Sequence, residues 1–218
     1  MNTKRLLSLV VVLSIFPAFA GHAAETKPTL KLVAEGFVQP TALEPIDNGR
    51  ALIADQLGQI HLLNKGEKLH DKLVLDLGSK LATYNTNSFD ERGLVGLAIH
   101  PKFSGNRKFY AFFSAPLRES APTNFSHTAR LSEFTLGRDD TAGGERIILE
   151  IDMPYFNHHS GRMAFGPDGF LYVSVGDGGN GNDVDAPAKN GNQIRGKAPE
   201  GNGQSKNTLM GKVLRLDV

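Results

Sequence analysis

The chain has 218 residues, a formal net charge of +1, and no cysteine or tryptophan. The balanced charge gives no reason to expect a nucleic acid or an anionic membrane as a partner. The lack of cysteine excludes disulfides, thiolate nucleophiles, cysteine-ligated zinc and covalent c-type haem. Glycine and proline are frequent and no segment keeps a helical period over three turns, so the composition favours an all-β chain with many turns.

The first residues have the form of a secretory signal. A basic start is followed by an apolar core over residues 6–15 and by small-residue cleavage sites up to Ala24. The apolar run is short and Pro17 interrupts it, which disfavours the alternative of a retained membrane anchor. We expect a signal peptide at residues 1–24, a mature domain at residues 25–218, a periplasmic or secreted location and no membrane span.

Short segments rich in β-branched and aromatic residues, separated by turn-forming residues, predict strands along the mature chain. The expected strands are, in chain order, residues 30–37, 40–43, 51–55, 59–63, 72–77, 93–101, 108–114, 128–136, 146–151, 163–165, 170–175 and 212–216. Turns are expected at residues 48–50, 105–106 and 166–169. Residues 79–92 are polar and without periodicity, which predicts a long loop.

A weak internal repeat links the beginning and the end of the mature chain. Residues 48–63 and residues 168–216 both contain a turn, a strand, a connection, a glycine and a second strand. In the second copy the connection grows to residues 176–210, which are rich in glycine and asparagine. Such repeated units favour a β-propeller of four-stranded blades. The alternative is a β-sandwich, which also has short strands and frequent turns.

The length of the chain does not suffice for a large closed ring. Known propeller repeats use roughly 40–50 residues a blade, so the mature chain supplies about three to four blades. Closed rings have about four to eight blades. The chain also stops at Val218 directly after a strand, with nothing to cover the open edge. We therefore expect it to be the front part of a longer protein.

Residues 153–179 carry the densest group of chemically active side chains. His158 lies just before the first strand of a hairpin and Asp177 just after its second, so the two should meet at one end of the sheet. A histidine beside a carboxylate is the arrangement of a general base with its orienting partner. His159 should point to the other side of the extended chain, in contact with the site or on the surface. No third ligand accompanies the two histidines, which disfavours zinc.

Each of these residues also has an ordinary structural interpretation. His158 could donate to a backbone carbonyl, and Asp177 could stabilise its own turn. Glu91 and Arg92 could line the cleft or pair with each other on the surface. Arg162 is expected to be a structural hydrogen-bond donor. The oxygen-rich connection that follows Asp177 lacks the spacing of an EF-hand calcium loop, which favours a flexible or substrate-facing loop.

Three segments resemble signatures of the glucose/sorbosone dehydrogenase family. They are residues 90–103 (DERGLVGLAIHPKF), residues 157–179, which begin NHHSGRMAFGPDG and end GDGG, and residues 209–217 (LMGKVLRLD). The family consists of exported quinoproteins, among them soluble PQQ-dependent glucose dehydrogenase and aldose sugar dehydrogenase. The resemblance implies a six-bladed β-propeller, of which this chain covers roughly the first half. It also implies PQQ bound on the top face and calcium holding the cofactor.

The resemblance assigns roles residue by residue. His158 matches the catalytic base of the family and Asp177 the carboxylate beside it. Asn157 and Glu91 fall at substrate-contacting positions, where the glucose enzymes have an acidic residue and a glutamine, so the choice of sugar should differ. The cofactor-clamping residues and the calcium ligands of the family are expected beyond Val218, and no metal ligand is assigned in this chain.

The function implied by the resemblance is that of an exported PQQ-dependent sugar dehydrogenase. His158 would take the proton from the anomeric hydroxyl of the sugar while hydride passes to the quinone, and an external electron acceptor would complete the cycle. The alternative is a non-catalytic extracellular β-propeller that serves as a binding module. Glu91 and the missing cofactor half favour the binding module, and the intact histidine motif favours the enzyme.

Overall fold

The computed structural model of the protein describes residues 28–65, 68–69, 72–84, 88–181, 183 and 196–218. The chain divides into two compact units, Met1–Leu32 and Val33–Val218, and the second unit contains every strand described below. The expected signal peptide at residues 1–24 lies outside the described residues. Within the described part, no helix is long and apolar enough to cross a membrane.

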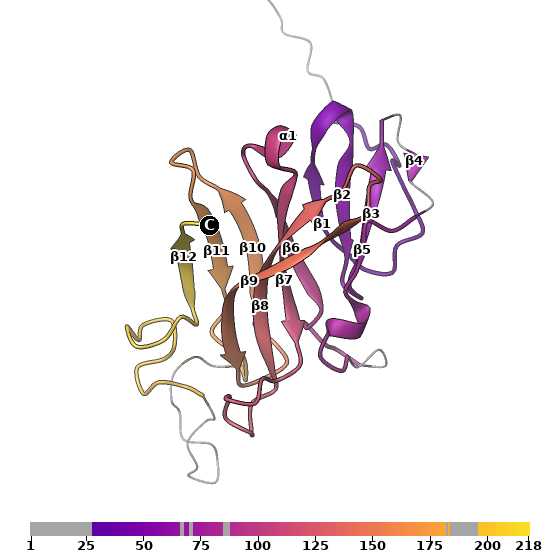
Figure 1. The fold of residues 1–218 in the computed structure, drawn as a ribbon. Helices are drawn as coiled ribbons and strands as arrows, with labels where there is room; N and C mark the ends of the chain where they lie inside the picture. Colours follow the sequence, from indigo (N-terminus) through magenta and orange to yellow (C-terminus); the bar gives the residue numbers. More distant parts are fainter. Residues whose placement is uncertain (1–27, 66–67, 70–71, 85–87, 182, 184–195) are drawn as a thin grey trace, which may run out of the picture. The chain divides into compact units, whose positions relative to one another are not determined.

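The first sheet contains five antiparallel strands (Figure 1). They are β1 (Pro40–Pro45), β2 (Ala51–Asp55), β3 (Gln59–Asn64), β4 (Lys68–Leu69) and β5 (Leu75–Asp76). The chain reverses between β1 and β2 through the 3-10 turn η1 (Asp47–Gly49), in which Asn48 has a φ of 53°. The turn predicted at residues 48–50 and the following hairpin are confirmed. A second 3-10 turn, η2 (Gly78–Lys80), comes after β5.

The second sheet has four antiparallel strands in chain order. They are β6 (Leu94–Ile99), β7 (Lys108–Ala115), β8 (His127–Leu136) and β9 (Ala142–Met153). The predicted pairing of residues 108–114 with residues 128–136 is confirmed, because Phe109 lies opposite Phe134. This sheet has the four-stranded form expected of a propeller blade.

The third sheet has three antiparallel strands. They are β10 (Ser160–Phe165), β11 (Leu171–Val175) and β12 (Lys212–Leu216). The predicted turn at residues 166–169 joins β10 to β11, where the amide of Gly169 donates to the carbonyl of Gly166 at 3.0 Å. The two ends of the repeated unit, β11 and β12, therefore pair as neighbours.

The three sheets are in contact through their first strands. The Thr41 hydroxyl on β1 donates to the Leu94 carbonyl on β6 at 2.9 Å. A Cβ atom on Gly96 of β6 would lie only 2.0 Å from the Gly161 carbonyl oxygen on β10. Further along the same two strands, the rings of His100 and Phe165 are 5.5 Å apart. Strands β6 and β10 therefore run in the same direction, as Figure 1 also shows.

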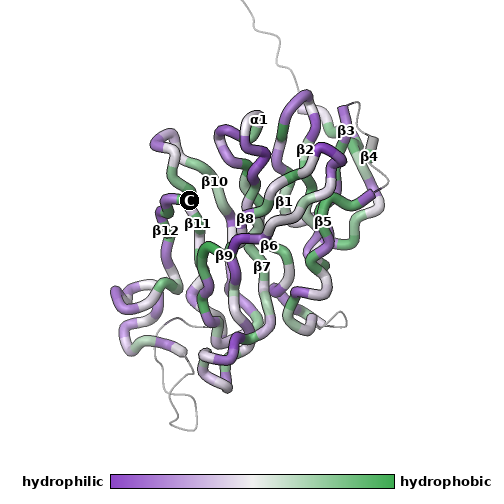
Figure 2. Tube along the Cα trace, in the orientation of Figure 1, coloured by the Kyte–Doolittle hydropathy of each residue, from purple (hydrophilic) through white to green (hydrophobic). Residues whose placement is uncertain are grey.

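The core fills the spaces between successive sheets. Along β7, Phe109, Ala111 and Phe113 belong to a buried cluster that includes side chains of the first sheet. The alternate residues Tyr110 and Phe112 belong to a second cluster that includes side chains of the third sheet. This alternation follows from the two-residue period of a strand, and Figure 2 shows the hydrophobic residues concentrated along the strands.

Some of the sequence-based expectations are wrong. Residues 30–37 form no strand, although Ala34 and Phe37 pack against buried side chains of β2 and β3. Instead of a turn at residues 105–106, the short helix α1 (Phe103–Asn106) is closed by Arg107 at a φ of 54°. Within the expected strand 72–77 only β5 pairs, whereas β9 is longer than expected at both ends. The overall prediction of an all-β chain is confirmed.

Candidate functional site

The backbone at the start of β10 has an uncommon conformation. His158 and Ser160 have φ values of 59° and 60°, in the left-handed region that residues other than glycine rarely adopt. Gly176, directly after β11, holds this segment in place, because its amide donates to the His159 carbonyl at 3.0 Å. A Cβ atom on Gly176 would lie 1.6 Å from the His158 carbonyl oxygen, so only glycine fits there. Strain of this kind is maintained by the surrounding contacts.

His158 and Asp177 meet at this end of the sheet, as the hairpin topology predicts. His158 Nδ1 lies 2.9 Å from Asp177 Oδ1. The same carboxylate oxygen accepts the Gly179 amide at 3.0 Å, so Asp177 both stabilises its turn and orients the histidine. The carboxylate selects the tautomer with a proton on Nδ1, which leaves the lone pair on Nε2. The His158 side chain is 36% exposed, so solvent reaches the imidazole.

A buried lysine that the sequence-based reasoning missed completes this arrangement. Lys197 Nζ lies 3.0 Å from Asp177 Oδ2, and the Lys197 side chain has no solvent exposure. Burial alone would raise the pKa of Asp177, but hydrogen bonds from Gly179, Lys197 and His158 lower it below its ordinary value. Asp177 is therefore held as a carboxylate between a cation and an imidazole.

The segment before β12 wraps around two carboxylates. Asp183 accepts the amides of Asn202 and Gly203 at 2.8 and 2.6 Å, and its Oδ1 lies 3.2 Å from Lys197 Nζ. The Asn202 side chain donates to the Asp177 carbonyl at 2.7 Å. These contacts attach the end of the long connection to the backbone of Asp177. Asn182 and Asp185, which also belong to this oxygen-rich connection, lie outside the described residues.

The two predicted substrate-contacting side chains both touch the site. Glu91 Oε2 accepts the backbone amide of His158 at 2.5 Å. Asn157 Oδ1 accepts the Asn180 amide at 3.2 Å. The suggested pairing of Glu91 with Arg92 is wrong, because Arg92 Nη2 contacts Asp90 Oδ2 at 2.5 Å. Both side chains thus shape the loops around His158.

His159 is buried, which corrects the expectation that it might lie on the surface. Its Nε2 lies 3.1 Å from the Tyr155 carbonyl oxygen. The His159 ring packs edge-on against His127, with ring centroids 4.3 Å apart. Within the described part of the chain, both ring nitrogens of His127 and Nδ1 of His159 have no hydrogen-bond partner. Burial lowers the pKa of both histidines, that of His127 to about 2.

Two exposed phenylalanines flank the Glu91 segment. Phe89 is 68% exposed and Phe156 is 42% exposed. Their ring centroids are 6.5 Å apart with the rings edge to face. The Glu91 amide donates to the Phe156 carbonyl at 3.4 Å, which connects this aromatic pair to the site. An exposed apolar pair beside polar groups is typical of a ligand-facing rim.

Other polar groups near these sheets have structural roles. Arg162 Nη1 donates to the Thr41 carbonyl at 3.4 Å, which is consistent with the structural role expected for Arg162. Among the residues that the structure describes, no group of three or more His, Cys, Asp or Glu side chains is arranged to hold a metal ion.

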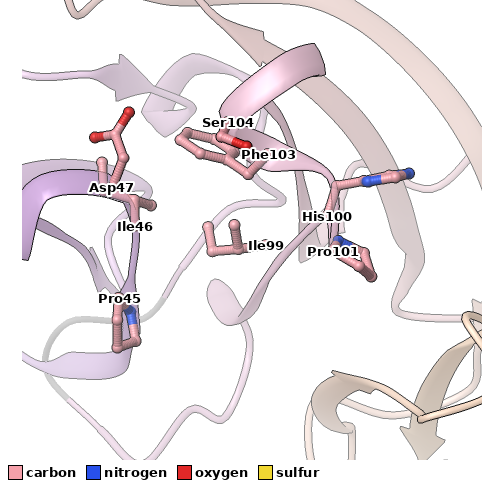
Figure 3. Close-up of a pocket in the computed structure, with 8 residues that line it drawn as sticks. All are labelled: Pro45, Ile46, Asp47, Ile99, His100, Pro101, Phe103 and Ser104. Carbon is pink, nitrogen blue, oxygen red and sulfur yellow. The ribbon is translucent and has the colours of Figure 1, made fainter.

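A separate hollow of about 280 Å³ lies at the opposite end of β1 and β6 (Figure 3). Pro45, Ile99 and Phe103 line its apolar part. Two of its polar side chains already have partners, and the first is Asp47, which contacts Arg50 at 2.7 Å. His100 Nδ1 likewise accepts the Lys102 amide at 2.9 Å. We therefore place the candidate site at the His158 end.

Antiparallel sheets that pack side by side through their first strands, one of them four-stranded, are typical of the blades of a β-propeller. Comparison with known proteins is more specific. Residues 37–217 match the model of the glucose/sorbosone dehydrogenase family, and the chain belongs to this family.

Two relatives show the range of proteins that this chain resembles. It is 32% identical to the Hedgehog-interacting protein of Mus musculus over 152 residues, which cover 67% of this chain and 22% of that protein. It is 26% identical to quinoprotein glucose dehydrogenase B of Acinetobacter calcoaceticus over 226 residues, which cover 99% of this chain and 47% of that protein. The chain thus spans less than half the length of these relatives.

Solved structures confirm the fold. The PQQ-bound form of aldose sugar dehydrogenase from Streptomyces coelicolor superposes with a TM-score of 0.63 at 21% identity, covering 87% of this chain and 47% of that chain. The apo form of soluble aldose sugar dehydrogenase from Escherichia coli gives a TM-score of 0.59 at 19% identity, covering 82% and 44% of the two chains. The fold is part of a β-propeller.

Proposed function

We propose that this protein is an exported PQQ-dependent sugar dehydrogenase in which His158 removes the proton from the anomeric hydroxyl. The hydrogen bond between His158 Nδ1 and Asp177 Oδ1, in a chain of this family, is the observation that supports the proposal. A general base needs an accessible lone pair on a group held within reach of the substrate. His158 offers such a lone pair on Nε2.

The residues of this chain account for the proton-transfer half of the reaction. Oxidation of an aldose at C1 removes a proton from the hydroxyl oxygen and a hydride from the carbon, and leaves a lactone. His158 takes the proton, Asp177 stabilises the imidazolium that results, and Glu91 holds the backbone amide of His158. PQQ, when bound, supplies the two-electron acceptor for the hydride.

The described residues fit proton transfer better than they fit the binding of an anionic cofactor. PQQ is a tricarboxylate, and carboxylates are bound by charge-assisted hydrogen bonds from cations. The two cations at this site already face carboxylates, Arg92 that of Asp90 and Lys197 that of Asp177. We therefore propose that the groups holding PQQ, and the calcium expected with it, come from outside the described residues.

The proposed substrate contacts lie on the loops around His158. Asn157 and Glu91 provide oxygen and nitrogen groups for sugar hydroxyls, and Phe89 and Phe156 provide an apolar rim. A sugar ring has both polar edges and apolar faces, which this combination matches. We further propose a periplasmic or secreted location, with an external electron acceptor that takes the electrons onward.

The test is sugar oxidation by the full-length protein and its His158→Gln variant, each supplied with PQQ, calcium and an artificial electron acceptor. The variant should lose about 100- to 10,000-fold in turnover, the usual contribution of a general base. His61→Gln is the matched control, because His61 lies on β3 against Phe37 and not at the site. Equal turnover of wild type and His158→Gln would refute the assigned role.

The second candidate function is a non-catalytic extracellular binding module. The 32% identity to a protein named for its interaction with Hedgehog favours it. Titration of the full-length protein with PQQ, followed by the absorbance of the cofactor, separates the two candidates. Saturable binding supports the enzyme, whereas the absence of binding together with the absence of sugar oxidation supports the module.

A further inference from the structure

Lys197 is a buried charged group at the site that the proton-transfer step leaves unused. Its ammonium nitrogen lies 3.0 Å from Asp177 Oδ2, 3.1 Å from the Asp177 carbonyl oxygen and 3.2 Å from Asp183 Oδ1. The side chain has no solvent exposure. A lysine is rarely buried completely unless its charge is paired, so these oxygens account for its position.

The contacts of Asp177 divide between its two carboxylate oxygens. Oδ2 faces Lys197, whereas Oδ1 accepts the Gly179 amide and contacts His158 Nδ1. Rotation of the carboxylate would break contacts on both sides at once. The ammonium therefore determines which oxygen is presented to the histidine.

The charges around His158 make the lysine important for the protonation state of the base. Two carboxylates face the histidine, Asp177 at the ring and Glu91 at the backbone amide. A nearby negative charge favours the protonated imidazolium, which cannot accept a proton from a substrate. Lys197 contacts one of these two carboxylates, that of Asp177, and also contacts Asp183.

We propose that Lys197 is a positioning residue for the base, which fixes the Asp177 carboxylate and offsets its charge, so that Asp177 Oδ1 holds His158 Nδ1 and Nε2 stays free. The role of Lys197 in catalysis rests on the proposed function. Its effect on His158 can be measured without any turnover. The inference can therefore fail while sugar oxidation by His158 stands, and the reverse also holds.

The main experiment follows His158 by NMR in the full-length protein labelled with ¹³C-histidine, and the His158→Gln spectrum assigns its signal. In Lys197→Met the midpoint of the His158 titration should rise by about one pH unit, because opposite charges within a few ångströms shift a pKa by roughly 1–3 units. An unchanged midpoint would overturn the proposal. If turnover is present, the acid limb of the kcat/KM profile should move in the same direction.

Lys212 provides a matched control in the same segment. Its ammonium donates to the carbonyl oxygens of Asn202, Gly203 and Met210, at 2.6, 3.3 and 3.0 Å. Lys212→Met should loosen the segment as Lys197→Met does, but leave the His158 midpoint unchanged. Equal shifts in both variants would mean that Lys197 acts only by holding the loop, which would also overturn the proposal.

A chemical rescue separates the charge of Lys197 from its bulk. The 218 residues contain no cysteine, so Lys197→Cys introduces the single thiol among them, and any cysteine elsewhere in the full-length protein is first replaced by serine. Alkylation of the unfolded variant with bromoethylamine, followed by refolding, restores an ammonium at lysine length, whereas iodoacetamide gives a neutral amide. The aminoethyl form should recover the wild-type His158 midpoint and the amide form should not. This pair also replaces Lys197→Met if methionine at that position does not fold, and equal midpoints in the two forms would refute the proposal.

Discussion

Single residues determine the geometry of the site, and Gly176 shows this most directly. Its lack of a side chain lets the end of β11 approach the backbone of His158, which is itself in the left-handed region. The position of the base therefore depends on a residue that takes no part in its chemistry.

Gly176→Ala should destabilise the protein by about 1–3 kcal/mol, the usual cost of forcing extra atoms into a packed region. The new methyl group would collide with the His158 carbonyl and displace the base, so turnover should fall as well. Urea unfolding measures the first effect. Gly105→Ala is the control, because a Cβ atom there meets nothing within 4 Å, and an equally large loss in the control would contradict the explanation.

The buried pair His127 and His159 should make the protein sensitive to mild acid. The folded state lowers the pKa of both rings, so each must stay neutral to remain buried. Above the unfolded pKa near 6.5 both rings are neutral in either state, and their contribution to stability is complete. As pH falls below 6.5 this contribution is lost, by up to about 1.4 kcal/mol for each histidine and each pH unit.

His127→Phe should therefore reduce the loss of unfolding free energy between about pH 6.5 and pH 5, a window in which most carboxylates stay ionised. Urea denaturation at a series of pH values provides the measurement. If the variant and the wild type lose stability in parallel, the histidine pair is not the source of the acid sensitivity.

At the scale of single residues, contacts between neighbouring elements of the chain could be predicted from the sequence, whereas contacts between distant elements could not. Because a hairpin returns to its starting point, the meeting of His158 and Asp177 could be predicted from their places beside adjacent strands. Lys197 could not be predicted, because it follows a connection without periodicity and its contacts depend on how that connection folds back. The burial of His159 depends on His127, which lies on a strand of another sheet.

At the scale of strands, the buried carboxylate of Glu133 joins three neighbouring strands of the second sheet. Glu133 on β8 accepts hydrogen bonds from Tyr110 on β7 and from Arg146 on β9, at 2.9 and 2.8 Å. The hydrogen bond from Arg146 is the main reason why the pKa of Glu133 is lowered to about 2, although burial alone would raise it. Hydrogen bonds from Lys108 and Tyr110 contribute to the lowering.

Glu133→Leu should cost about 1–3 kcal/mol, because it leaves the buried Tyr110 hydroxyl without its acceptor. Glu133→Gln keeps an acceptor and should cost less. The charge of Glu133 stabilises the fold above its unfolded pKa near 4.3. This stabilisation disappears as pH falls towards 2, so the gap between wild type and Glu133→Gln should close on acidification. Urea titrations at pH 7 and pH 3 test both statements.

Strands could be predicted where apolar residues alternate between turn residues, as they do along β7 and β8. A strand could not be predicted correctly at residues 30–37, where side chains such as Phe37 pack on the first sheet but the backbone joins no sheet. A strand depends on its partner, and that partner is not encoded locally. Helix α1 was missed because its four residues are too few to show a period.

At the scale of the whole unit, β7 connects the two halves of the core. Phe113 packs with the first sheet and Phe112 with the third, although they are neighbours on one strand. The core is therefore continuous through the second sheet, and the three sheets should lose their structure together.

Phe112→Ala and Phe113→Ala should each cost about 3–5 kcal/mol, the usual range for truncating a buried phenylalanine. Both variants should still unfold in one transition, seen alike by far-UV circular dichroism and by the near-UV signal of the tyrosines. Separate transitions for the two signals would show that the sheets are independent.

Because the first strands of the sheets run in the same direction, the reactive groups and the packing residues lie in different parts of the molecule. The segments that enter β6 and β10, together with the connection after β11, carry the reactive groups, whereas the buried faces of the strands carry the packing. Exposed side chains in these segments, such as Phe89 and Leu209, can therefore vary without disturbing the core, whereas Leu81 and Met210 pack in it and must be kept. A library of variants confined to such exposed positions should change the substrate preference of the proposed dehydrogenase far more often than it changes melting temperature, which makes this fold a favourable starting point for laboratory evolution.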